Sequence, residues 1–66
     1  MIVLVNSKQQ ELADGATVAA LLEFLGFQRQ RIAVEVNGAL VTRNDWPQYK
    51  LKEGDRLEIV SFVGGG

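Results

Sequence analysis

A single stretch of this sequence has the spacing of an amphipathic helix, and that limits the folds open to the chain. Its apolar residues follow the i, i+3, i+4, i+7 pattern of one helical stripe: Val18, Leu21, Leu22 and Leu25. Thr17 can cap the start of this helix, and Gly26 supplies the left-handed stop that commonly follows a last turn. Because one helix covers only one face of a sheet, any sheet in this chain keeps an uncovered face.

Strand-like patterns occupy much of the remaining chain. Five ranges show them: residues 1–5, 9–13, 32–36, 39–41 and 56–63. The first is apolar on both alternate faces, as in a central strand, whereas the second is mostly polar, as at a sheet edge. The third alternates apolar and polar residues, and Asn37-Gly38 after it suits the two-residue type I′ turn of a hairpin.

These elements predict a single α+β domain over residues 1–63, followed by a flexible glycine tail at residues 64–66. The domain is expected to be a mixed four- to five-stranded sheet with one helix packed on one face, and with the first and last strands central. The predicted core consists of the apolar residues that face the helix: Val3, Val5, Leu12, Val18, Leu21, Leu22, Leu25, Val34, Val36, Leu57 and Ile59.

The opposite face of this sheet should carry apolar residues without a cover. Successive side chains of a strand point to opposite faces of the sheet. The alternation that places the core residues under the helix therefore places Leu4, Val60 and Phe62 on the uncovered face. With Val63, which follows directly, they form the predicted partner-docking surface. The alternative is that they are scattered surface apolar residues of the kind that most proteins expose.

Residues 42–52 show no clean period. Pro47 disfavours helical angles at Trp46, so a helical turn over residues 43–45 should stop there. Trp46 and Tyr49 could form a binding platform, but in so small a domain we expect these aromatic side chains to close one end of the core.

Composition excludes several function classes. The chain has 66 residues, no cysteine, no histidine and a net charge of −1, which leaves no His-based acid/base pair, no thiol nucleophile and no ordinary zinc set. Without a basic stripe, a membrane span or a signal segment, we expect a cytoplasmic protein that binds neither nucleic acid nor membrane. The turn and edge carboxylates should be solvated surface groups: Glu35, Asp45, Glu53 and Asp55. The domain is therefore not expected to be an enzyme, nor to bind a cofactor or metal itself.

The sequence ends in Gly64-Gly65-Gly66 directly after the last strand pattern. Three extended glycines span at most roughly 10 Å and would carry the Gly66 carboxylate into a narrow site without side-chain hindrance. The alternative interpretation is an ordinary frayed terminus.

Taken together, these features resemble the β-grasp, or ubiquitin-like, domains and in detail the ThiS-type sulfur carrier proteins of thiamin biosynthesis. The resemblance covers the whole chain. It rests on Asp14-Gly15-Ala16-Thr17-Val18, Val34-Glu35-Val36-Asn37-Gly38, Arg43-Asn44-Asp45-Trp46, the run from Leu51 to Val60, and Phe62-Val63-Gly64-Gly65-Gly66.

The resemblance implies a cycle run by other enzymes. A ubiquitin-activating-like adenylyltransferase would dock on the bare sheet face, receive Gly64 and Gly65 in its active site, and use ATP to convert the Gly66 carboxylate to an acyl-adenylate. A sulfur-donating persulfide protein would then leave a thiocarboxylate on Gly66, and thiazole synthase would take the sulfur. Two alternatives remain: a carrier like the small subunit of molybdopterin synthase, and a non-covalent ubiquitin-like interaction module.

Overall fold

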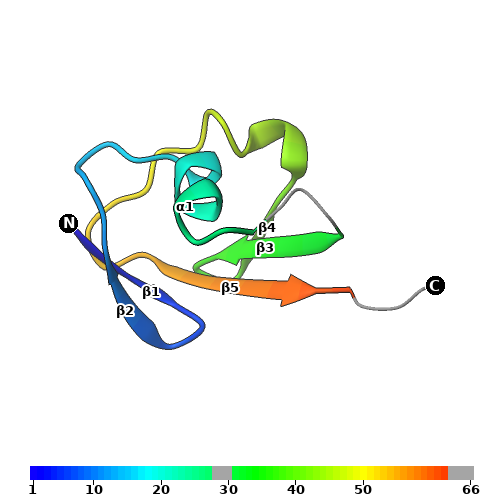
Figure 1. Ribbon diagram of the computed structural model, residues 1–66, viewed down its shortest axis with the longest axis horizontal. Coiled ribbons are helices and arrows are strands. Elements are labelled where there is room, and N and C mark those ends of the chain that lie inside the picture. The colour runs from blue at the N-terminus through cyan, green and yellow to red at the C-terminus, as the bar shows by residue number, and fades with distance from the viewer. Residues whose placement is uncertain (28–30, 63–66) are drawn as a thin grey trace.

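The computed structural model describes residues 1–27 and 31–62 of the chain (Figure 1). The strands are β1 (Ile2–Val5), β2 (Lys8–Glu11), β3 (Ile32–Val36), β4 (Ala39–Val41) and β5 (Arg56–Ser61). The helix is α1 (Val18–Phe24), and a 3₁₀ turn spans Arg43–Asp45. That turn ends at Asp45, as expected, but Trp46 itself has helical angles (φ −53°, ψ −45°), so the prediction that Pro47 excludes them at Trp46 is wrong.

The five strands form one sheet in the order β2-β1-β5-β3-β4. β1 and β5 run parallel and the other neighbouring pairs are antiparallel, so the sheet is mixed. Figure 1 shows α1 lying over one side of this sheet. The predicted fold class is confirmed, and the two most apolar strands, β1 and β5, lie inside the sheet as expected.

Both hairpins close through two-residue turns with positive φ at each turn residue. Asn37 and Gly38 have φ of 53° and 86°, which confirms the predicted type I′ turn between β3 and β4. Asn6 and Ser7 form the equivalent turn between β1 and β2, with φ of 49° and 72°. Because this turn needs only two residues, β2 begins at Lys8, one residue before the predicted start.

Helix α1 begins where predicted, and its first amide groups are all paired. The Oγ1 of Thr17 accepts from the N–H of Ala20 at 3.1 Å. The N–H of Val18 donates to the carbonyl of Tyr49, and the next N–H donates to the carbonyl of Trp46. The segment before β5 is therefore fastened to the helix start, and the helix ends before Gly26, whose φ is +82°.

The core lies between α1 and the sheet and includes most of the predicted residues. Trp46 is buried as well, and so are two residues that the sequence patterns did not assign to the core: Val41 and Leu51. The indole N–H of Trp46 donates to the Val41 carbonyl at 2.9 Å, so this ring packs inside the domain, as expected, and Tyr49 packs partly buried against the same cluster.

The prediction for Asp55 is wrong, because this carboxylate is buried rather than solvated. Its side chain is 7% exposed, and its two oxygens accept from the N–H of Lys52 at 2.8 Å and from the amide of Asn37 at 3.0 Å. The side chain joins the turn before β5 to the β3–β4 turn. Two hydrogen bonds offset the cost of removing this carboxylate from water.

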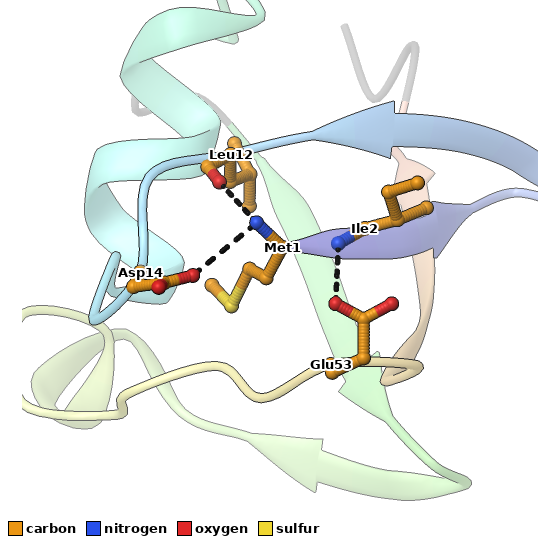
Figure 2. A network of polar contacts seen from close by, with 5 residues as sticks. All are labelled: Met1, Ile2, Leu12, Asp14 and Glu53. Atoms are coloured by element: carbon orange, nitrogen blue, oxygen red, sulfur yellow. Dashed lines mark hydrogen bonds and ion pairs between the residues drawn. The ribbon is translucent and has the colours of Figure 1, made fainter.

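A polar network fixes the corner where β1 begins (Figure 2). The amino group of Met1 donates to the Leu12 carbonyl at 2.8 Å and lies 3.3 Å from a carboxylate oxygen of Asp14. The N–H of Ile2 donates to the Glu53 carboxylate at 2.9 Å. These bonds hold the first strand between the loop before α1 and the turn before β5.

Candidate functional site

The predicted modified residue and its approach lie outside the described residues. These are Gly66, where the family resemblance implies adenylation, Gly64 and Gly65, and the predicted docking residue Val63. Their roles stay predictions. The described part of the candidate site is the strand that leads to them and the sheet face beside it.

Two predicted docking residues lie close together on the face away from α1: Val60 is in β5, and Phe62 directly follows its last residue. Val60 is 53% exposed and Phe62 is 58% exposed. The register pairs Val60 with Ala33 of β3, so the neighbour of Val60 on the next strand is a small side chain. Apolar surface at this position is available to a partner.

Leu4 shares this face but lies elsewhere on it. The parallel register places Leu4 beside Arg56, with Glu58 between Arg56 and Val60 along the strand. Leu4 is also partly buried. The structure therefore brings Val60 and Phe62 together, and it separates Leu4 from them by charged side chains.

Sequence reasoning missed two large apolar residues on the same face, Ile2, which is 42% exposed at the start of β1, and Leu40. Leu40 is 64% exposed and pairs with Glu35 across the β3–β4 hairpin, which places it on the side away from the helix. The alternation of β4 contained this signal, because Val41 points into the core and its neighbour must point out. We define the bare-face patch as Val60, Phe62, Ala33 and Leu40.

Two carboxylates lie within this patch. Glu35 and Glu58 are directly opposite each other on β3 and β5, and both are exposed. Within residues 1–27 and 31–62, the single ion pair joins the Met1 amino group to Asp14, so neither glutamate is neutralised by a salt bridge there. The patch is thus apolar at its ends and acidic at its centre.

Two asparagine side chains fix the position of β5 under this patch. The carboxamide of Asn6 brackets Ile59, since its Oδ1 accepts from the Ile59 N–H at 2.8 Å and its Nδ2 donates to the Ile59 carbonyl at 3.2 Å. At the other end, the Oδ1 of Asn37 accepts from the Arg56 N–H at 3.0 Å. The strand that leads to the glycines is therefore held at its start and again at Ile59.

The helix side of the molecule has a hollow of about 490 Å³ between α1, the 3₁₀ turn and the start of β3. Apolar groups, including Leu22, Ile32 and Trp46, make up much of its lining. In the described part of the chain, no three His, Cys, Asp or Glu side chains gather as metal ligands. No helix there is long and apolar enough to cross a bilayer.

A β-grasp sheet with one uncovered face, whose last strand is followed in the sequence by a glycine run, defines a small protein of the ubiquitin-like class. The chain matches the ThiS family over residues 3–66. It is 32% identical to the sulfur carrier protein ThiS of Escherichia coli strain K12, with 100% of both chains covered. The chain therefore belongs to the ThiS family, as the resemblance predicted.

Two further comparisons agree with this assignment. The crystal structure of the thiamine biosynthesis protein ThiS from Geobacter metallireducens superimposes with a TM-score of 0.84, at 33% identity and with 100% of each chain covered. A thiazole synthase of Paramagnetospirillum magneticum is 38% identical over 66 residues. That match covers the whole of this chain but 20% of the thiazole synthase, so the chain spans a fifth of that relative's length.

Proposed function

We propose that this chain carries sulfur for thiamin biosynthesis on the carboxyl group of Gly66. Membership of the ThiS family supports the carrier role, and the match extends through residue 66. The full-length similarity to a sulfur carrier protein is the observation that carries the proposal. The described structure adds a firmly held strand that leads towards the glycines, beside an exposed apolar patch.

The first step is activation of the carboxylate by a ubiquitin-activating-like adenylyltransferase. A Gly66 oxygen attacks the α-phosphate of ATP, pyrophosphate leaves, and an acyl-adenylate remains. A carboxylate is a poor electrophile, whereas its mixed anhydride with AMP has a good leaving group. Because ATP is a substrate of the partner, the carrier itself needs no cofactor site.

The second step brings in sulfur from a persulfide protein. The terminal sulfur attacks the Gly66 carbonyl and AMP leaves, after which a thiol cleaves the S–S bond and a thiocarboxylate remains. This chain has no cysteine, so no internal thiol can intercept the activated carbonyl. The cytoplasm, where ATP is present, is the compartment in which we expect this cycle.

Thiazole synthase is the proposed acceptor of the sulfur. Support comes from the relative named thiazole synthase, which contains a segment similar to this entire chain. Glycines at 64 and 65 would let the same terminus enter both the adenylating site and the acceptor site.

The test is adenylation of tail variants. Gly65→Val adds bulk inside the enzyme's channel, and one residue added after Gly66 moves the carboxylate away from the α-phosphate of ATP. Displacements of this size cost orders of magnitude in rate, so both variants should lose ATP–pyrophosphate exchange. Binding through the bare-face patch should persist, and Gln9→Ala, on the same face but in β2 and separated from β5 by β1, is the control with normal exchange.

Intact mass provides the second readout. With enzyme, ATP and a sulfur donor, the wild-type mass should increase by the difference between sulfur and oxygen, and the change should map to Gly66. Normal adenylation of the extended variant, or modification elsewhere, would overturn the carrier mechanism. A chain that binds through its sheet face but is never adenylated would instead be an interaction module.

A further inference from the structure

The backbone groups of β5 bond alternately to the strands on its two sides. Its even-numbered residues bond to β3, since the Phe62 N–H donates to the Arg31 carbonyl at 2.7 Å and the Arg56 carbonyl accepts from Asn37 at 2.7 Å. Its odd-numbered residues point to the β1 side, where the Leu57 carbonyl accepts from the Asn6 N–H at 2.9 Å. Adjacent residues of a strand alternate in this way.

On the β1 side, Asn6 provides the last partner. The backbone turns away at this residue, with φ of 49°, and its carboxamide bonds both the N–H and the carbonyl of Ile59. These are the bonds that the next peptide group of β1 would have made. The Asn6 side chain thus adds one more pair of hydrogen bonds between β1 and β5 at the point where the backbone of β1 turns away.

The following backbone groups on this edge belong to Ser61. Its N–H and carbonyl point to the same side as those of Ile59, and no residue among 1–27 and 31–62 bonds to either. Ser61 is exposed, and Figure 1 shows β5 continuing past the β1–β2 turn. Sheet edges are usually blocked by charge, proline or a covering segment, because an open edge accepts another strand. Here the adjacent residues are the exposed apolar side chains of Val60 and Phe62.

We propose that the open edge at Ser61 pairs with an extended main-chain segment of the adenylating enzyme. The inference rests on the proposed function and specifies how the carrier is held. Ser61 precedes Gly66 by five residues, so main-chain bonds at this point would fix the register at which the tail enters the enzyme. Strand addition obtains affinity from the backbone and specificity from side-chain pockets, and Val60 and Phe62 lie where such pockets would receive them.

A second copy of this chain fits the edge poorly. In an antiparallel pair centred on Ser61, the next residue towards the domain is Ile59, whose backbone groups already bond to Asn6. The described residues would then contribute the bonds of Ser61 alone, which is far less contact than a stable dimer requires, whereas in the proposed enzyme complex these bonds would add to contacts along the tail and the bare-face patch.

Ser61→Pro tests the proposal directly. Proline removes the N–H that points to the open edge and places its ring there, while the Phe62 bond to β3 is untouched. Val60 already has the extended conformation that a residue before proline requires. Ser61→Ala keeps the N–H and is the matched control. A synthetic chain with an ester in place of the amide at residue 61 removes the same donor without changing shape.

The proline and ester variants should unfold cooperatively like the wild type and bind the adenylating enzyme about 10-fold more weakly, whereas Ser61→Ala should bind normally. In the complex, hydrogen exchange at the Ser61 amide should slow, while the Phe62 amide is protected with or without enzyme. Wild-type affinity of the ester variant, or unchanged exchange at Ser61 in the complex, would overturn the proposal. The proposal would also be overturned if Ser61→Pro abolished self-association of the chain but left binding to the enzyme intact, because the edge would then pair with a second copy. If the wild type is not adenylated at all, it is the carrier function that fails.

Discussion

The two faces of this sheet are built from the same strands but do different work. On the helix side, Val34 and Leu57 are 0% and 1% exposed, whereas on the other side Leu40 and Val60 are 64% and 53% exposed. Along β5, single steps of the chain alternate between the two. In so small a domain, one helix can bury only one face, so the fold depends on that face and leaves the other available for partners.

Removing apolar volume from the covered face should have the largest effect. Leu57→Ala leaves a cavity in the centre of the core, and such changes cost about 2–5 kcal/mol. A domain of this size has a total stability of only about 3–10 kcal/mol. We expect much of the protein to unfold at 37 °C, as measured by circular dichroism and thermal melting.

The matched control is Leu40→Ala, which removes the same atoms from the bare face. Its free energy of unfolding should change by no more than about 0.5 kcal/mol. Similar losses for the two variants would show that the faces are not energetically distinct.

Asp55 should give the next largest effect. Asp55→Ala leaves the Lys52 N–H and the Asn37 side-chain amide without their acceptor, which costs about 1–3 kcal/mol. Asp45→Ala is the comparison, because this exposed turn carboxylate makes one long contact, 3.4 Å, to Thr42. Urea unfolding should therefore show a clear fall in midpoint for the first variant and almost none for the second. Equal midpoints would contradict a structural role for Asp55.

The difference between these two aspartates shows which features can be predicted from the sequence and which cannot. Helix, strands and hairpin turns could be predicted because period and turn residues encode them locally. The burial of Asp55 depends on Asn37, which is 18 residues away, and that contact has no periodic signature. The same holds for the burial of Leu51, whose N–H donates to the carbonyl of Ala16, far from it in the sequence.

The candidate site likewise has one part that the sequence predicts and one part that it does not. The alternation of the last strand predicted that Val60 and Phe62 lie on the uncovered side. Which residues flank them depends on the register between strands, and this register places Leu4 beside Arg56. One-strand patterns fix the face of a residue but not its neighbours across the sheet.

Phe62→Ala should separate binding from stability. The ring is exposed, so its removal should lower the free energy of unfolding by less than about 1 kcal/mol. If Phe62 is a docking residue, its loss should weaken binding to the adenylating enzyme at least 10-fold, since exposed aromatics are frequent hot spots. Calorimetric titration and thermal melting on the same samples measure both effects. Parallel loss of binding and of melting temperature would place Phe62 in the fold instead.

The smallest expected effect concerns the acidic centre of the bare-face patch. Glu35 and Glu58 face each other across β3 and β5, and like charges in directly opposed positions are destabilising. Glu35→Gln removes this repulsion and should raise the melting temperature by about 1–3 °C at low salt. Glu11→Gln is the matched control, because Glu11 lies on the same face but pairs with Ile2. The difference between the two variants should shrink at 1 M salt, where the screening length is about 3 Å. Equal melting temperatures at low salt would mean that the two carboxylates do not repel each other measurably across β3 and β5.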